Sequence, residues 1–416
     1  MNEKKQNGSG KRRVWRGLTT LLAALLAFVL AASPVVAANR TDIDKFLGTQ
    51  STKIETDTST GENPYTYQSD YKSTTELLDA IEDLGERINE EGSVLLKNNG
   101  ALPLTQEETQ KVTLLGFSSY YPVQGGDMGS SLAVNTGTDA DTVDLVQAFT
   151  AKGYGLNPTM ETVYKSLEDT FKTEVESWGG TQTYHRQTAP ATDGVFTSHE
   201  PSQAALSGAD ADWKDSMDDY NVMIVTIARA AGENRNYMPG EAGVDPAQNL
   251  NQTDPLGLSD DERDIISAAV EAKAQNGGKV VVLLNNASAM EIDEIKRNDG
   301  VDAILEIGLP GGYGFYGVAD ILSGAANPSG RLADTYAVVN ANSPAAQNYG
   351  NFPYTNANQE LYINSALVEA ESIYAGYKYY ETRYADVVLG QGNAADAAGS
   401  STGGAWSYDS EVSYPL

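Results

Sequence analysis

The sequence predicts an α/β fold in which a mainly parallel sheet lies between two layers of helices. Continuous apolar runs, such as KVVVLL at residues 279–284, are typical of strands that are buried on both faces. Segments in which apolar residues recur at helical spacing separate these runs. The chain has 416 residues, of which 40% are hydrophobic, so it can build a substantial core.

The ordered part is expected to begin at Ser73, which forms a capping-box pattern with Glu76 ahead of an apolar helical repeat. A second capping box, Ser259 and Glu262, predicts a helix that runs to about Gln275. Strands are expected at residues 92–104, 112–117, near 154, 222–228, 279–284 and 302–307, and further helices at 141–152, 159–175, 290–296 and 311–323. Residues 176–205, which hold both histidines of the chain, have the composition of an insertion.

The two ends of the chain have a different composition from the body. Residues 1–16 are basic, residues 17–38 carry no charge and end in small residues, and residues 39–72 are polar. This order predicts a signal peptide or membrane anchor at 1–38 and a spacer at 39–72, so the body is expected to be exported and to meet a membrane only through residues 17–38. The ordered domain is expected at 73–384, and residues 385–416 are interpreted as a flexible linker and the start of a following β domain.

Charge and cysteine content exclude several classes of function. The formal net charge is −29, and the first 38 residues contribute six basic residues and one acidic residue, which leaves the remainder still more acidic. Such a body repels phosphate backbones, so nucleic acid is not expected as a partner. The chain has no cysteine, so it has no disulfide or thiol nucleophile, and no metal or other cofactor is expected. A Ser-His-Asp hydrolase is disfavoured because no G-x-S-x-G motif is present.

The functional interpretation depends most on one stretch, residues 221–245. The apolar run at 222–228 ends at Arg229 and opens into a polar loop in which glycines precede two glutamates, Glu233 and Glu241. In open α/β sheets, ligands bind at the carboxyl ends of the strands, so such a loop is well placed for chemistry. A solvated surface loop is the simpler interpretation of an acidic loop in an acidic protein.

Several segments in order resemble the α/β sandwich domain of glycoside hydrolase family 3, the β-glucosidase-type enzymes. They include EEGSVLLKNNGALPL at 90–104, the glycine- and serine-rich loop GGDMGSS at 125–131, RAAGE at 229–233, and the long run from 299 to 332. The resemblance covers residues 73–384 and implies an (α/β)6-type three-layer sandwich. In that family the sandwich domain lends an acid/base glutamate to a TIM-barrel domain that supplies an aspartate nucleophile.

The resemblance also implies roles for individual residues. The family loop reads R-x-S-G-E-G, so Glu233 is the first candidate for the acid/base and Glu241, in a similar Gly-Glu setting, is the second. Substrate contacts are expected from Arg229 and from four residues of the loop at 125–131, Gly125, Gly126, Ser130 and Ser131.

No segment of the chain has the pattern of an eight-fold barrel, which needs about 250 residues. The nucleophile is therefore expected in a TIM-barrel domain, downstream or on a separate chain, as in family members with reversed domain order. The expected substrate is an oligosaccharide or glycoside, and the expected location is extracellular or anchored to the membrane facing outward. The alternatives are a non-catalytic exported carbohydrate-binding or cell-surface interaction protein and, third, a nucleotide-binding domain. The loop at 308–317 does not favour the third, because it lacks the G-x-G-x-x-G spacing.

Overall fold

A computed structural model describes residues 6–39, 70–125, 142–177, 180–185, 188–190, 196–198, 200–230, 256–348, 352–353, 365–366, 368–391 and 405–416. The chain divides into two compact units, Met1–Lys72 and Ser73–Leu416. In the first unit, α1 (Gln6–Ala38) is a single helix. Its segment Val14–Val36 has a mean hydropathy of 2.2, so it is long and apolar enough to cross a membrane, a property that signal sequences share.

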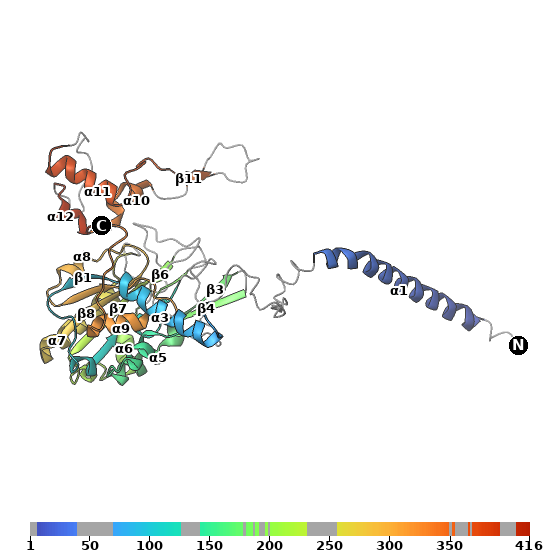
Figure 1. Cartoon of the computed structure of the whole chain (residues 1–416), viewed down its shortest axis with the longest axis horizontal. Coiled ribbons are helices and arrows are strands. Elements are labelled where there is room, and N and C mark those ends of the chain that lie inside the picture. The colour runs from blue at the N-terminus through green and yellow to red at the C-terminus, as the bar shows by residue number, and fades with distance from the viewer. Residues whose placement is uncertain are drawn as a thin grey trace, which may run out of the picture. The chain divides into compact units, whose positions relative to one another are not determined.

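A five-stranded sheet forms the centre of the second unit, with the strand order β1-β9-β8-β7-β2 (Figure 1). These strands are β1 (Val94–Asn98), β2 (Val112–Leu115), β7 (Val222–Arg229), β8 (Lys279–Asn286) and β9 (Ala303–Glu306). Strands β2, β7, β8 and β9 are parallel, and β1 joins the edge antiparallel to β9. The predicted α/β fold with a mainly parallel sheet is therefore confirmed.

Helices pack in two groups about this sheet (Figure 1). The first group is α3 (Thr74–Gly92), α4 (Leu145–Ala151) and α9 (Phe315–Ser323), and the second is α5 (Pro158–Ser166), α6 (Gln203–Ala209) and α7 (Asp260–Asn276). A shorter helix, α8 (Asp293–Arg297), connects β8 to β9. Strands β2, β7 and β9 are buried along their whole length, as expected for a sheet covered on both faces.

Two predicted helices and one predicted strand need correction. The helix expected at 159–175 ends at Ser166, and Lys172–Ser177 instead forms strand β3, because it pairs with β4 (Gly180–His185) along its whole length. The helix expected at 311–323 begins only at Phe315, because Gly311 adopts a positive φ of 70°. Near residue 154 there is no strand in the described chain, only a single bridge between Leu156 and Val112.

The remaining elements are short. The segment expected as an insertion, residues 176–205, contains the end of β3, β4, a hairpin of β5 (Thr188–Pro190) and β6 (Phe196–Ser198), and the start of α6. After α9 follow β10 (Tyr336–Ala337), α10 (Pro344–Asn348), β11 (Phe352–Pro353), β12 (Ser365–Ala366), α11 (Tyr377–Arg383), a π-helical turn (Tyr384–Val388), α12 (Tyr408–Glu411) and β13 (Val412–Tyr414). Strand β13 pairs antiparallel with β10, so the C-terminal residues return to the body of this unit.

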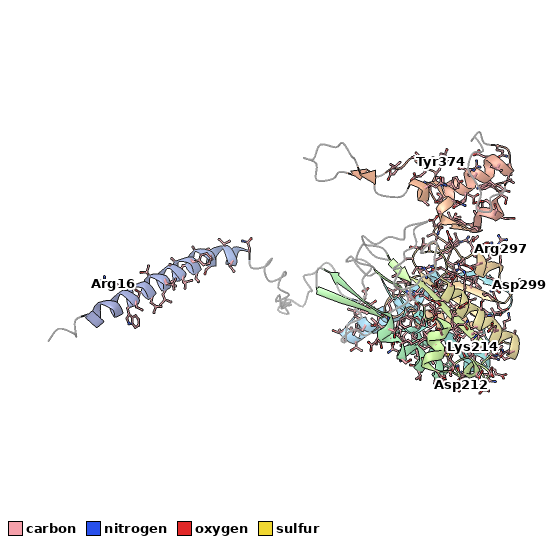
Figure 2. All side chains as sticks on the ribbon, turned by 180° about the vertical axis from the view of Figure 1, so that it is seen from behind. Arg16, Asp212, Lys214, Arg297, Asp299 and Tyr374 are labelled. Carbon is pink, nitrogen blue, oxygen red and sulfur yellow. The ribbon has the colours of Figure 1, made fainter. Side chains whose placement is uncertain are left out.

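Two exposed basic side chains, Lys214 and Arg297, form ion pairs with acidic side chains of the same unit. Lys214 lies 5.5 Å from the ring centroid of Trp213 and 3.3 Å from a carboxylate oxygen of Glu271. Arg297 pairs with Asp293 four residues before it on α8; Figure 2 labels both Lys214 and Arg297. Such exposed pairs each contribute about 0 to 1 kcal/mol, so they add little to stability.

Candidate active site at the carboxyl edge of the sheet

The carboxyl ends of β2, β7, β8 and β9 meet at one edge of the sheet, because these four strands are parallel and in register. Polar side chains are buried where three of these strands end: Arg229 on β7, Asn285 and Asn286 on β8, and Glu306 on β9. Burying a polar group is costly unless the group is hydrogen-bonded, so each of these side chains is expected to bind a specific partner. We therefore describe this edge as the candidate site.

The two predicted site loops leave this edge from neighbouring points. Val123, two residues before Gly125, packs with Ala228 and Ala230 at the end of β7, and Leu309 lies against the same cluster. The structure thus brings the chain that leads to Gly125 close to the end of β7. Gly126, Ser130, Ser131, Glu233 and Glu241 lie outside the described residues, so their assignments stay predictions.

Asn285 holds the segment that leads into the first of these loops. Its Oδ1 accepts from the backbone nitrogen of Val123 at 2.8 Å, and its Nδ2 donates to the carbonyl oxygens of Val123 at 2.9 Å and Gly308 at 2.7 Å. The backbone nitrogen of Gly311 also donates to the carbonyl of Gln124 at 2.7 Å. One amide therefore joins the ends of two strands to the chain that leads into the loop at 125–131.

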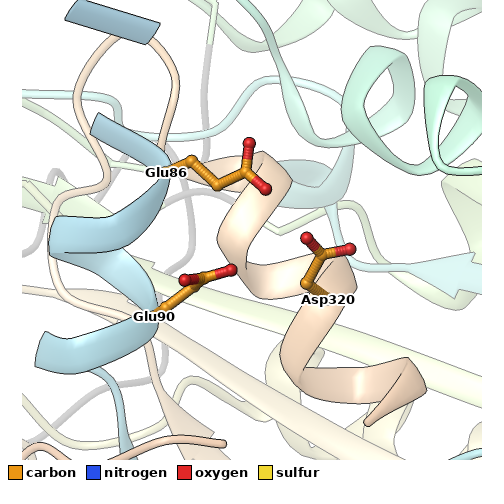
Figure 3. Close-up of side chains that lie close together, drawn as sticks. All are labelled: Glu86, Glu90 and Asp320. Atoms are coloured by element: carbon orange, nitrogen blue, oxygen red, sulfur yellow. The ribbon is translucent and has the colours of Figure 1, made fainter. Parts of the chain in front are cut away.

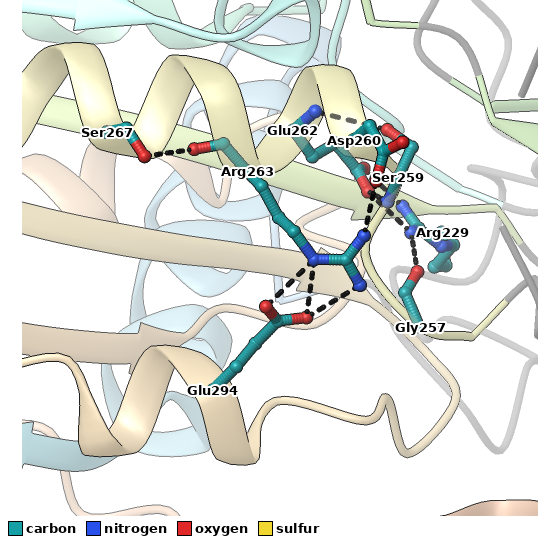
Figure 4. A network of polar contacts seen from close by, with 8 residues as sticks. All are labelled: Arg229, Gly257, Ser259, Asp260, Glu262, Arg263, Ser267 and Glu294. Carbon is teal, nitrogen blue, oxygen red and sulfur yellow. Dashed lines mark hydrogen bonds and ion pairs between the residues drawn. The ribbon is translucent and has the colours of Figure 1, made fainter. Parts of the chain in front are cut away.

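Arg229 has no exposed surface, and its guanidinium is held by a buried carboxylate (Figure 4). Its Nη1 and Nη2 donate to the two carboxylate oxygens of Glu262 at 2.7 and 2.9 Å, and Nη2 also donates to the carbonyl of Gly257 at 2.5 Å. Glu262 in turn accepts from the backbone nitrogen of Ser259 at 2.7 Å, which completes the predicted capping box of α7. Arg229 therefore ties the end of β7 to the start of α7, and this buried position gives it a positioning role.

Glu306 is a buried carboxyl group at the end of β9. It accepts from the backbone nitrogen of Gly308 at 3.0 Å and from the hydroxyl of Tyr336 at 2.9 Å. When the amide of Asn286 is oriented with its nitrogen toward Glu306, that nitrogen lies 2.7 and 2.8 Å from the two carboxyl oxygens. Burial raises the pKa of Glu306 to about 8, although both hydrogen bonds lower it. The group is therefore largely protonated at neutral pH.

A second buried carboxyl group, Glu200, lies at the end of β2. It accepts from the backbone nitrogen of Phe117 at 2.8 Å and from the hydroxyl of Tyr164 at 3.1 Å. Burial raises the pKa of Glu200 well above its ordinary value. Gly116 precedes this turn with a φ of 91°, and a Cβ there would lie 2.5 Å from the carbonyl oxygen of Thr226, so only glycine fits.

The described residues contain one group of three carboxylates that could hold a metal ion, Glu86, Glu90 and Asp320 (Figure 3). The ammonium of Lys152 already lies 2.7 Å from both Glu86 and Asp320. A lysine in this position supplies the positive charge that a cation would supply. We therefore interpret the group as an ion-pair network between α3 and α9.

Glu306, Glu262, Asn285 and Asn286 are not candidates in the sequence analysis. A signal for Asn285, Asn286 and Glu306 exists, because β8 and β9 change from apolar to polar residues at their last positions. Glu262 has only the capping-box pattern with Ser259, which gives no sign of its partner Arg229. The pairing of Arg229 with a residue 33 positions away has no local signature, so sequence spacing could not reveal it.

Comparison with known proteins gives a consistent set of similarities. A family model described as "Glycosyl hydrolase family 3 C-terminal domain" matches residues 93–378. A β-glucosidase of Ruminococcus albus is 27% identical over 300 residues, which are 71% of this chain and 26% of that protein. A β-glucosidase of Schizophyllum commune is 30% identical over 165 residues, which are 39% of this chain and 73% of that protein.

Among solved structures, β-glucosidase 3B from Thermotoga neapolitana in complex with glucose has a TM-score of 0.54 at 24% identity. The match covers 73% of this chain and 36% of that one. A β-glucosidase from Paenibacillus barengoltzii has a TM-score of 0.52 at 22% identity, with coverage of 73% and 28%. These likenesses establish the fold, and the chain spans 26% of the length of the R. albus relative.

Proposed function

Because the chain belongs to glycosyl hydrolase family 3 through that family's C-terminal domain, we propose that it supplies the acid/base loop of an exported, retaining, β-glucosidase-like glycosidase. The aspartate nucleophile would come from a TIM-barrel domain outside these 416 residues, as in a family member with reversed domain order. The observation that carries the proposal is the apolar cluster of Val123, Ala228 and Ala230, from which both candidate loops leave the carboxyl edge. A carboxylate and a sugar-binding loop that begin together can act on one substrate.

Retaining hydrolysis needs two carboxyl groups about 5 to 5.5 Å apart, one to attack the anomeric carbon and one to protonate the departing oxygen. In this proposal Glu233, or failing that Glu241, is the proton donor, and later the base that activates water. Gly125, Gly126, Ser130 and Ser131 would line the sugar site. Arg229 would act on the substrate indirectly, because it is buried and holds Gly257 at the far end of the loop that carries Glu233.

Export is part of the proposal. It is supported by the apolar helix Val14–Val36 near the N-terminus and by the six basic residues that precede or begin it. The division of the chain into 1–38, 39–72, 73–384 and 385–416 stays a proposal. The pairing of β13 with β10 supports assigning residues 412–414 to the body rather than to a following domain.

Replacing Glu233 with glutamine should lower turnover by about 100-fold or more in an enzyme assembled with a nucleophile-bearing barrel domain, because general acid catalysis contributes about that factor. The loss should be larger on a natural disaccharide than on an aryl glycoside with an activated leaving group, which needs less protonation. Steady-state rates on both substrates measure this difference. The matched control is Glu241→Gln, which should retain most of the activity. The opposite pattern between the two variants would transfer the role to Glu241, and unchanged rates in both would refute a loop-borne acid/base.

A second experiment tests the division of labour between domains. The purified body of the chain, residues 39–416, should release no measurable sugar from glycosides on its own, because it carries only one of the two required carboxyl groups. Robust hydrolysis by this body alone would refute the proposal. Sugar binding without hydrolysis, even after a barrel domain is supplied, would instead favour a non-catalytic carbohydrate-binding protein.

A further inference from the structure

Helix α3 turns its aliphatic side chains away from the domain that it packs on. Five of them are 40% to 62% exposed: Leu77, Leu78, Ile81, Leu84 and Ile88. The side of the helix that contacts α9 carries polar residues instead, among them Glu86 and Glu90 (Figure 3), and Gly85 faces Tyr313 in the turn before α9. An amphipathic helix on the surface of a domain ordinarily has the reverse arrangement.

Specific contacts stabilise this orientation. Asn89 is buried and donates from Nδ2 to the carbonyl oxygen of Ile307 at 2.9 Å. Gly317 on α9 allows the backbones to approach, since a Cβ there would lie 2.5 Å from the carbonyl of Glu86. Lys152 neutralises Glu86 at 2.7 Å. The polar side of α3 is thus the side built to pack on the domain, and the aliphatic side is left for another surface.

The exposed aliphatic residues form a continuous stripe. Leu77, Ile81, Leu84 and Ile88 are spaced by four, three and four positions, which is the spacing of a seam between two packed helices. Contiguous apolar surface of this kind on a soluble domain marks an interaction site, whereas single exposed apolar residues do not. The stripe ends at Ile88, and the next residue, Asn89, faces the domain and donates to the carbonyl of Ile307, just past β9.

The charge beside the stripe identifies the kind of partner. Helix α3 carries seven acidic residues and one basic residue, Arg87, which pairs with Glu91 on the same helix. Two copies of this helix would bring these acidic residues together, and the whole chain carries a formal charge of −29, so charge opposes self-association. A partner with basic side chains beside an apolar stripe would meet complementary charge.

We propose that the aliphatic face of α3 is a docking surface for an amphipathic helix of a protein partner, whose apolar stripe is flanked by lysine or arginine. The partner helix lies along α3 with its apolar residues between Leu77 and Ile88. Its basic residues face the acidic residues of α3. This inference does not depend on the proposed glycosidase activity.

The probe that tests it is a pair of synthetic helical peptides with the same leucine stripe, one with lysine and one with glutamate at the flanking positions. The full chain, held in nanodiscs, is titrated with each labelled peptide, and binding is followed by fluorescence anisotropy at low and high salt. The lysine peptide should bind at least about tenfold more tightly than the glutamate peptide, and its affinity should fall as salt rises. Equal affinities for the two peptides would overturn the proposal.

Variants of the chain locate the binding surface. Ile81→Gln/Leu84→Gln/Ile88→Gln should weaken binding of the lysine peptide at least about tenfold, because these side chains would then lose the apolar surface that they bury against the peptide. The matched control is Val388→Gln/Leu389→Gln, which removes two aliphatic side chains that are also about half exposed but lie at the end of the π-helical turn and just after it. This variant should bind as the unmodified chain does. Circular dichroism establishes that each variant is folded, and Leu84→Gln alone provides a milder change. The proposal would be overturned if the folded triple variant bound the lysine peptide as tightly as the unmodified chain does. It would also be overturned if sedimentation showed a dimer of the full chain and the triple variant abolished that dimer.

Discussion

Replacing Arg229 with methionine is expected to lower the free energy of unfolding by about 3 to 5 kcal/mol, the cost of breaking a buried ion pair by removing one partner. Methionine fills much of the volume but leaves the carboxylate of Glu262 buried without its cation. It also removes the donors to Gly257 and to the carbonyl of Ala228, which Nη1 binds at 2.7 Å. Urea unfolding followed by tryptophan fluorescence measures the loss.

The matched control lies on the same helix as Glu262. Arg263 pairs with Glu294 at 2.9 Å, but its side chain is 42% exposed, so Arg263→Met should cost no more than about 1 kcal/mol (Figure 4). Adding Glu262→Gln to Arg229→Met should recover part of the loss, because the stranded charge is then absent. If Arg229→Met and Arg263→Met destabilise the chain equally, Arg229 does not tie β7 to α7 as described.

Stability should fall as pH rises toward and through 8, and Glu306→Gln should remove one component of that fall. The pKa of Glu306 is raised from 4.5 to about 8 in the folded chain by burial, so between these values the folded state binds more protons than the unfolded state. Its stabilising contribution is therefore fully present below about pH 4.5 and is lost as pH rises through 8, by at most about 1.4 kcal/mol per pH unit. Glutamine resembles the neutral carboxyl group, so the variant lacks this dependence.

The measurement is the unfolding free energy of both proteins at intervals from pH 5 to 9, and the informative quantity is the difference between the two curves. Other buried carboxyl groups, such as Glu200, are present in both proteins and cancel in that difference. A variant at an exposed glutamate, Glu271→Gln, should give a curve parallel to that of the unmodified chain. Parallel curves for Glu306→Gln as well would mean that Glu306 is not buried as a neutral group.

The sheet was predictable because its strands are continuous apolar runs, and such runs have few other stable placements than the centre of an α/β sandwich. Strands β2, β7, β8 and β9 lie where the sequence predicts them, and the capping box of Ser259 and Glu262 is present in both directions. Residues 172–175 were wrongly predicted as helix because partners at 182–185 override their local spacing. Chain-local patterns carry no information about such pairing.

The candidate site was predictable in its position but not in its buried chemistry. The sequence indicates that polar loops leave the carboxyl ends of the strands, and the common cluster of Val123 and Ala230 is consistent with that. It does not indicate that Arg229 is buried against Glu262. An arginine at the end of a strand is equally compatible with binding a ligand and with forming an ion pair to a distant helix. The orientation of α3 was hidden for a similar reason, since apolar spacing fixes which residues share a side and leaves open which side faces the domain.

The bond between Arg229 and the carbonyl of Gly257 joins the two ends of the segment at 230–256, the segment that contains Glu233 and Glu241. When the two ends of a segment are joined, a carboxylate on that segment is tethered. Its effective concentration at a neighbouring domain depends on the length of the segment. Doubling the length of a closed segment costs only about 0.6 kcal/mol of closure entropy, whereas effective concentration falls roughly as the −3/2 power of length. If Glu233 or Glu241 is the proposed acid/base, insertions or deletions between Ala230 and Leu256 would change the rate of proton delivery at little cost to the stability of the fold.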